Sequence, residues 1–290
     1  MLHSAASTLL RRSLPRFRAA AALSTSSTGT STLAIDVSAW LDARGVKLAN
    51  ARAQALDDAA GGGGRLGFTT ATAARAGDTL ATLPRSAIFC AATANEALQN
   101  PLSTVCREVI SGYGALREAE KGGGPERFDA MELALLLVAE RRMPGHASAW
   151  GAWLDAAEAA ARSQPEGHWN ASSDRFFVKF AASLEDDLEP VFDPLLAFGP
   201  ATESFFDALA TWYSYATWRG KRLPAAPGAL EEVGLGLSLL PLSLGGGGVV
   251  DGARNAELRL LDEGEQIETG GGFLAVEAKE AIAAGGEILM

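Results

Sequence analysis

The chain has 290 residues, 48% of them hydrophobic, so it is long enough to bury a sizeable core in one large domain or two small ones. Its net charge of -10 argues against non-specific nucleic-acid binding, which requires a basic face. No apolar run approaches the roughly 18 residues of a membrane-spanning helix. We therefore expect neither nucleic acid nor membrane among its partners.

Metal and disulfide chemistry finds little support in the sequence. Two cysteines, Cys90 and Cys106, give no disulfide framework, and with His3, His146 and His168 they show no zinc-ligand spacing. The sequence also has no G-x-S-x-G nucleophile elbow. We predict no metal site.

The first 35 residues differ in kind from the rest of the chain. They hold no acidic residue, a Ser/Thr-rich tract from Ser24 to Thr32, and the arginines Arg11, Arg12, Arg16 and Arg18. This composition is typical of an organelle transit peptide, with an ordinary disordered tail as the alternative. Its removal would take the net charge from -10 to -14. The amphipathic arginine region favours a mitochondrion, while the Ser/Thr tract suits a chloroplast equally well.

The next segment predicts one helix and two strands. The helix runs from Ile35 to the plausible stop at Gly45, and we interpret Trp40 on its apolar face as a core anchor. In the stretch Gly61 to Ile88, alternating residues broken by Gly77-Asp78 predict two short strands joined by a tight turn.

The glycine run before the first of these strands has two further interpretations. Gly62 to Gly67 fits the dinucleotide pattern G-x-G-x-x-G, but that site needs a following helix, and the sequence after it is Thr-rich. Four successive glycines can also be a plain flexible loop.

The middle of the chain is predicted to be mostly helical. The strongest helix covers 127–142 and is largely buried, because its apolar residues recur at helical spacing. Trp150 and Trp153 favour core packing over a ligand platform. Further helices are expected at 93–99 with Thr93 as N-cap, at 102–118, at 176–184 and at 205–218, before an apolar strand candidate at Leu237–Leu244.

Short motifs at the start, middle and end of the chain share one known pattern. They are Leu66-Gly67-Phe68, Gly77-Asp78 and Leu83-Pro84; then Leu137 to Arg141 with Gly145, Ser148, Trp150, Trp153 and Leu154; then Asn255 to Leu258, Phe273 to Val276, Ala278 to Ile282 and Gly285 to Ile288. The pattern resembles the SET-domain protein methyltransferases, in the subfamily of Rubisco large-subunit lysine methyltransferase and actin-histidine methyltransferase.

The resemblance implies an α+β fold, with a SET-type β-fold of short strands and a large, mostly helical insert at about 92–222. The domain would span 36–290, after a transit peptide of residues 1–35. It would end before the family's Ser-Tyr-Gly motif and C-terminal substrate-binding domain.

The same resemblance implies S-adenosyl-L-methionine as cofactor, contacted through the backbone around Arg65, Leu66, Gly67 and Phe68. The implied function is protein-lysine N-methyltransferase on an organelle protein. Its partner would be a lysine side chain of that protein, and the enzyme would be a monomer.

The chain departs from the family pattern at several cofactor positions. Tyr215 stands where relatives carry an arginine, for which Arg219 or Arg222 could substitute; Leu244 replaces an acid; and Gly247-Gly248 replace an Asn-His pair. The catalytic residues are therefore unassigned. From these departures we expect the chain to bind S-adenosylmethionine weakly or not at all and not to turn it over. The alternatives are a catalytically inactive SET-like protein-binding module and an incomplete gene model of an active enzyme.

Overall fold

The computed structural model describes residues 27–57, 64–97, 125–142, 148–162, 174, 177–178, 202–224, 234–244 and 254–290. The leader arginines, Cys106, His146, His168, Gly247-Gly248 and the predicted helix at 102–118 lie outside the described residues.

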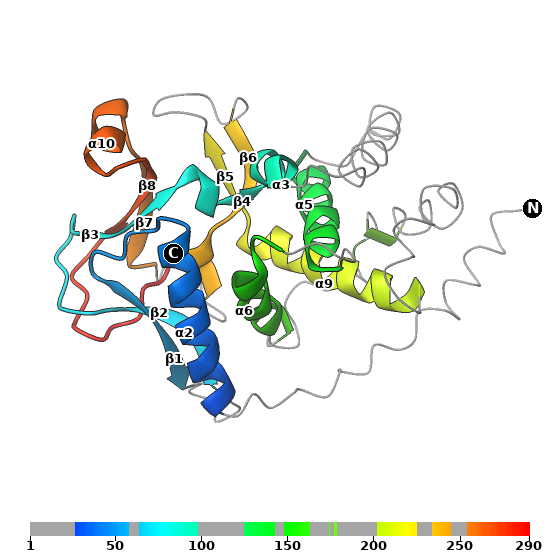
Figure 1. Cartoon of the computed structure of the whole chain (residues 1–290), viewed down its shortest axis with the longest axis horizontal. Coiled ribbons are helices and arrows are strands. Elements are labelled where there is room, and N and C mark those ends of the chain that lie inside the picture. The colour runs from blue at the N-terminus through cyan, green and yellow to red at the C-terminus, as the bar shows by residue number, and fades with distance from the viewer. Residues whose placement is uncertain are drawn as a thin grey trace, which may run out of the picture.

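The described strands form three small antiparallel sheets, ordered β1–β2, β3–β8–β7 and β4–β6–β5. The strands are β1 (Ala51–Asp57), β2 (Gly64–Thr70), β3 (Thr79–Pro84), β4 (Phe89–Cys90), β5 (Lys221–Pro224), β6 (Gly234–Leu239), β7 (Ala256–Leu260) and β8 (Gly272–Ala278). In Figure 1 the first two sheets and α2 lie to the left, and α5, α6 and α9 lie to the right. Short strands at both ends of the chain and helices between them confirm the predicted α+β class.

The helices between Cys90 and Lys221 match the predicted mostly helical insert as far as the described residues reach, and the domain bounds stay a prediction. The helices are α2 (Ser27–Ala43), α3 (Ala91–Ala97), α5 (Pro125–Arg142), α6 (Gly151–Arg162), α9 (Thr202–Arg219) and α10 (Glu263–Glu268). Thr93 is not the N-cap of α3, because the helix begins two residues earlier. Its hydroxyl instead accepts from the Cys90 N–H at 3.1 Å and donates to the Ile88 carbonyl at 2.6 Å.

The two strands predicted in Gly61 to Ile88 exist but do not pair with each other. β2 pairs with β1, which the sequence analysis did not assign, and β3 pairs with β8. The Gly77-Asp78 turn does form, with Gly77 at a φ of 86° that favours glycine. The residues between β2 and β3 connect two different sheets, and within them Ala74 forms an isolated bridge with Ile282.

Helix α2 starts earlier than predicted, at Ser27 rather than Ile35. Val37 and Leu41 are fully buried, and Ala34 is 7% exposed. The helix ends before Gly45, whose φ of 75° explains the stop that the sequence predicts. The predicted boundary between leader and domain therefore falls inside a helix that packs into the core.

An aromatic cluster of Trp40, Phe89, Trp150 and Trp153 joins α2 and β4 to α6. Neighbouring ring centroids lie between 5.1 and 6.4 Å apart. Trp150 and Trp153 are 1% and 0% exposed, so their interpretation as core residues is confirmed. The partly buried Trp40 also donates its indole N–H to the Ala149 carbonyl at 2.9 Å.

Arg44 attaches the end of α2 to this cluster. Its guanidinium lies 5.6 Å from the Trp40 ring centroid and 4.8 Å from that of Trp150, and it donates to the Ala149 carbonyl. Burial lowers the pKa of Arg44, and the negative charge of Glu140 partly opposes this shift. Glu140 is itself buried and accepts a hydrogen bond from Ser148 at 2.9 Å. Arg44 is therefore held both by the aromatic rings and by the charge of Glu140.

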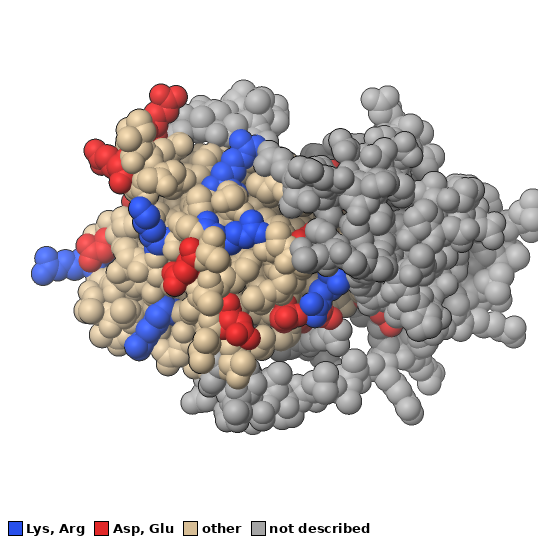
Figure 2. Space-filling model, viewed as in Figure 1, with Lys and Arg blue, Asp and Glu red and all other residues tan. Residues whose placement is uncertain are grey.

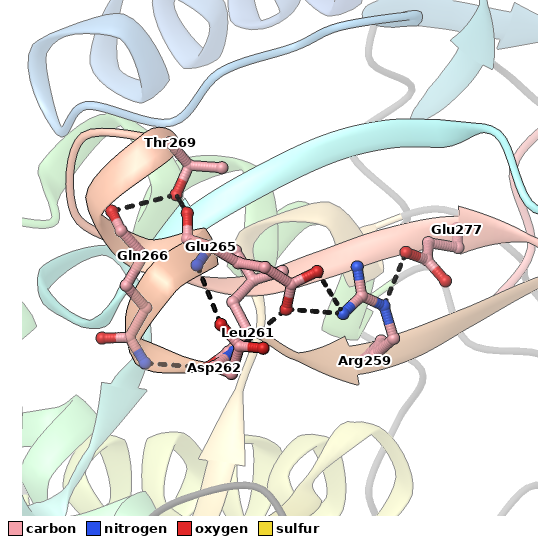
Figure 3. Close-up of polar contacts among 7 residues, drawn as sticks. All are labelled: Arg259, Leu261, Asp262, Glu265, Gln266, Thr269 and Glu277. Carbon is pink, nitrogen blue, oxygen red and sulfur yellow. Dashed lines mark hydrogen bonds and ion pairs between the residues drawn. The ribbon is translucent and has the colours of Figure 1, made fainter.

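Helix α10 is fixed to the β7–β8 hairpin by the contacts in Figure 3. Asp262 and Glu265 form a capping box at its N-terminus. Arg259 on β7 donates to Glu265 and to Glu277, each at 2.8 Å. The hydrogen bond from Arg259 is the largest cause that lowers the pKa of Glu265, and the bond from the Asp262 backbone lowers it further. At the other end of α10, Lys47 donates to the Thr269 carbonyl.

Charge on the described surface is mixed. Figure 2 shows lysine and arginine interspersed with acidic side chains on the visible face, without a field of one sign. None of the helices in the described ranges combines the length and apolar character needed to cross a membrane.

Helix α5 packs against α9 and is joined to β5 by an ion pair between Asp129 and Arg222. One turn after Asp129 stands Glu132, which is partly buried. Desolvation raises the pKa of Glu132, and the Asp129 charge raises it further. The carboxyl of Glu132 therefore keeps its proton to higher pH in the folded state than in the unfolded chain.

We predict that Leu136→Ala lowers the free energy of unfolding by about 2–5 kcal/mol, because Leu136 is 2% exposed inside α5. Ile267→Ala, at a position 81% exposed, should change it by less than about 0.5 kcal/mol. Chemical denaturation of both variants measures the contrast. An unchanged midpoint for Leu136→Ala would contradict the burial of this helix.

We also predict that Glu132→Gln is more stable than wild type at neutral pH. The Glu132 carboxyl contributes fully to the free energy of unfolding below its unfolded pKa of about 4.3. This contribution to stability is lost as the pH rises through the raised pKa of the folded state. A glutamine stays neutral throughout. Unfolding curves across this range should show the two proteins converging at acid pH. A constant difference would refute the assignment.

Candidate functional site

The predicted cofactor segment lies inside strand β2 rather than in a turn. Leu66, Gly67 and Phe68 are buried, with 7% of Leu66 and none of Phe68 exposed. β1 pairs with β2 along its whole length, and this pairing makes the segment extended. Arg65 belongs to the same strand, but its side chain lies outside the described part of the structure.

The second edge of β2 is joined by segment 285–289, near the end of the given sequence. The Ile288 N–H donates to the Phe68 carbonyl at 2.8 Å. The Thr70 N–H donates to the Gly286 carbonyl, and the Gly285 N–H donates to the Thr70 carbonyl, both at 2.9 Å. Two motifs that lie more than 200 residues apart in the sequence therefore meet at β2.

The same edge of β2 continues past this ladder as a row of backbone groups that we call the open edge. In an antiparallel strand, alternate residues direct their N–H and C=O to the same side. Phe68 and Thr70 bond to segment 285–289, so the Leu66 backbone points to that side as well. Among the described residues, the Leu66 N–H, the Leu66 C=O and the Phe68 N–H show no hydrogen-bond partner on this side. These three groups define the open edge.

The predicted strand Leu237–Leu244 divides into two elements, one of which contacts β2. β6 ends at Leu239, and Pro241–Leu244 forms a short 3-10 helix, η3, that contacts both β2 and α6. Leu244, at the position where relatives carry an acid, is 3% exposed and packs in the core. It therefore contributes apolar packing beside β2 and no charge.

Asn255 lies on the far side of segment 285–289. Its side-chain amide bonds to the Glu287 carbonyl and the Leu289 N–H, each at 2.8 Å. The sequence motif indicated a strand start here, and β7 does begin at Ala256. The side-chain role of Asn255 had no signal in the sequence, because its partners lie more than 30 residues away.

The other predicted cofactor candidates are engaged elsewhere. The Tyr215 ring is 0% exposed and packs edge-on against Trp212 at 5.8 Å within α9, so it presents no face to a ligand. Arg222 pairs with Asp129, and the Arg219 guanidinium lies 3.7 Å from the Trp218 ring centroid. The contacts of α9 are with α5, α6 and β6. The structure thus brings the β2 motif and the C-terminal motif together. The described contacts of Tyr215, Arg219 and Arg222 are with other residues.

The open edge offers two donors and one acceptor, all on the buried residues Leu66 and Phe68. Such groups bind and orient a polar ligand; they do not titrate, so they supply no acid or base. Within the described residues, no group of three histidine, cysteine or acidic side chains is arranged to hold a metal ion. The geometry therefore supports binding through the backbone more directly than any side-chain chemistry.

No protein-family model and no curated protein matches the chain. Solved structures do match at low identity. One is the SET domain of LSMT bound to lysine and AdoHcy, with 12% identity, a TM-score of 0.48 and coverage of 89% of this chain and 53% of that one. Others are Rubisco LSMT bound to AdoMet, with 12% identity and a TM-score of 0.45, and Rubisco LSMT bound to sinefungin and monomethyllysine, with 13% identity and a TM-score of 0.45. These cover 89% and 90% of this chain and 52% of theirs, so the chain spans about half the length of the structures it matches.

Proposed function

We propose that the chain is a SET-like, S-adenosyl-L-methionine-dependent protein-lysine N-methyltransferase whose cofactor binds along the open edge of β2. The observation that supports this most strongly is the set of backbone groups at Leu66 and Phe68 that have no hydrogen-bond partner among the described residues. They lie on the motif whose family resemblance implies backbone contact with this cofactor. The meeting of that motif with Gly285 to Ile288 adds support, because the same resemblance picks out both segments.

The reaction would be an in-line displacement, for which the bound cofactor supplies a methyl group on a sulfonium centre. The lysine amine must be neutral to attack, so it needs a site that excludes water and removes its proton. The chain's described contribution is orientation: the Leu66 and Phe68 N–H groups donate and the Leu66 C=O accepts. The apolar surroundings from η3 and α6 limit water.

A second function, that of a protein-binding module without turnover, is favoured by one observation. Gly247-Gly248 stand where the family carries an Asn-His pair, and glycine cannot replace side-chain hydrogen bonds to a charged ligand. Losing two such bonds, at roughly 1.5–3 kcal/mol each, weakens binding by about two to four orders of magnitude. We therefore expect the chain to bind the cofactor weakly or not at all.

We also propose that the protein works in an organelle, a mitochondrion in the first instance and a chloroplast in the second. The acid-free leader with four arginines supports this. Because Ala34, Val37 and Leu41 pack into the core from α2, the leader would be removed before Ser27, so that the helix stays whole.

The cofactor site is tested by Leu66→Pro against Leu66→Ala in the full chain. Both variants truncate the same buried side chain, but only proline removes the Leu66 N–H, and no β1 hydrogen bond depends on that group. We expect isothermal titration with S-adenosylmethionine to show affinity about 10- to 150-fold weaker for the proline variant. Equal affinities in two folded variants would exclude the open edge as the site.

Turnover is tested with the same protein and cofactor carrying a labelled methyl group, incubated with an organelle lysate. Label on a lysine of a lysate protein supports the methyltransferase. Binding of the cofactor without any labelling, or no binding at millimolar concentration, would favour the module without turnover.

Targeting is tested with a fluorescent reporter fused to residues 1–26. We expect import into an organelle, and a diffuse signal when Arg11, Arg12, Arg16 and Arg18 are all changed to glutamine. The mass of the imported full chain should place the mature N-terminus at or before Ser27. A diffuse signal from the unchanged leader would remove the organelle proposal.

A further inference from the structure

We propose that Asn255 is a positioning residue that sets the open edge through segment 285–289, and its effect on the cofactor rests on the function proposed above. The side chain does not touch β2. It acts on the segment that pairs with β2, and it does so from the opposite side of that segment.

Segment 285–289 is held along both of its edges. On one edge, Ile288 and Gly286 bond to Phe68 and Thr70 of β2. On the other edge, the Asn255 amide group donates to the Glu287 carbonyl and accepts from the Leu289 N–H, at 2.8 Å each. The backbone N–H groups of Asn255 and Ala256 both donate to the Leu289 carbonyl at 3.1 Å. The segment is therefore the only described strand-like piece with direct hydrogen bonds to both β2 and the start of β7.

The chemistry of these two side-chain bonds requires an amide. The Glu287 carbonyl needs a donor and the Leu289 N–H needs an acceptor, and both lie on the same side of the segment. An asparagine side chain offers one of each in a plane, at the spacing of a carbonyl and an N–H two residues apart. Aspartate at neutral pH only accepts, alanine does neither, and glutamine is longer by one methylene.

The consequence for β2 follows from the register. Glu287 and Leu289 flank Ile288, so the Asn255 bonds fix the residue whose N–H occupies the Phe68 carbonyl. The open edge begins at the next group along that strand, the Phe68 N–H. Release of Asn255 would let Ile288 move, and the Phe68 carbonyl and the adjacent open edge would lose their fixed geometry.

With aspartate at position 255, the bonds to Glu287 and Leu289 would depend on pH. If the residue acted only through packing, the exchange of these amides would not change with the protonation of its carboxyl. Its carboxylate repels the Glu287 carbonyl, whereas the protonated acid donates there and accepts from Leu289 as asparagine does. Four ionisable residues have backbone next to position 255 and can affect the pKa of this aspartate. They are Arg254 before it, Glu257 on β7, Lys279 after β8, and Glu287. A matched control is available in Asn50, whose side chain bonds in the same way to the N–H and hydroxyl of Thr72 and to its carbonyl.

The experiment is amide hydrogen exchange on the full chain, combined with S-adenosylmethionine titration. In Asn255→Ala we expect the exchange of the Ile288 and Leu289 amides to rise by about 5- to 160-fold, from the loss of two hydrogen bonds. Cofactor affinity should fall at least several-fold. At neutral pH Asn255→Asp should raise the exchange of these amides by less than the alanine variant does, because its carboxylate still accepts from the Leu289 N–H but cannot donate to the Glu287 carbonyl. It should return to the wild-type exchange level, corrected for intrinsic rates, when the carboxyl is protonated. Asn50→Ala should leave both readouts unchanged.

The outcomes separate the two proposals. Unchanged exchange at Ile288 and Leu289 in Asn255→Ala would overturn the positioning role, and so would an aspartate variant with no recovery at acid pH. Faster exchange with full cofactor affinity would overturn the link from segment 285–289 to the open edge. A wild-type protein that binds no S-adenosylmethionine would overturn the proposed function and its cofactor link, while the exchange data would still decide whether Asn255 fixes the segment.

Discussion

The hydrogen-bond ladder of segment 285–289 is the constraint on which the β-rich half of the molecule depends. The β1–β2 sheet is too small to be stable alone, since two strands seldom hold together without further packing. Segment 285–289 bonds to Phe68 and Thr70 on one side and to Asn255 and Ala256 on the other. A second bridge from Ala74 to Ile282 closes the same junction. Residues from both ends of the chain must therefore meet before either sheet has its full set of partners.

The helical half is attached by apolar and aromatic packing rather than by a ladder. Trp40 from α2 and Phe89 from β4 meet Trp150 and Trp153 at the start of α6, and Arg44 lies over two of these rings. The β4–β6–β5 sheet packs against α3, α5 and α9 within this half. Packing of this kind tolerates similar residues but not polar ones, whereas the ladder tolerates most side chains and depends on register. The two halves are thus constrained by different physics.

This difference explains which features the sequence revealed. Helix α5 and the burial of Trp150 and Trp153 could be predicted, because helical periodicity and aromatic burial are local properties. The α+β class followed from the same patterns. The pairing of β3 with β8 could not be predicted, because Thr82 and Ala275 are joined across almost two hundred residues and nothing near Gly77 shows it. The role of Asn255 was hidden for the same reason.

The positions of the open-edge backbone groups depend on the register of β2 with its neighbours and only weakly on which side chains the strand carries. The side chain at Arg65 leaves the direction of the Leu66 and Phe68 N–H groups unaltered, since the ladder with β1 and segment 285–289 sets it. Asn255 has no such freedom, because its two bonds come from the side chain and need a donor and an acceptor at fixed spacing. The sequence can therefore diverge widely along β2 while the geometry persists, provided that the residues holding segment 285–289 do not change. The hydrogen bonds that hold segment 285–289 are therefore more informative about the geometry of β2 than the identity of its side chains is.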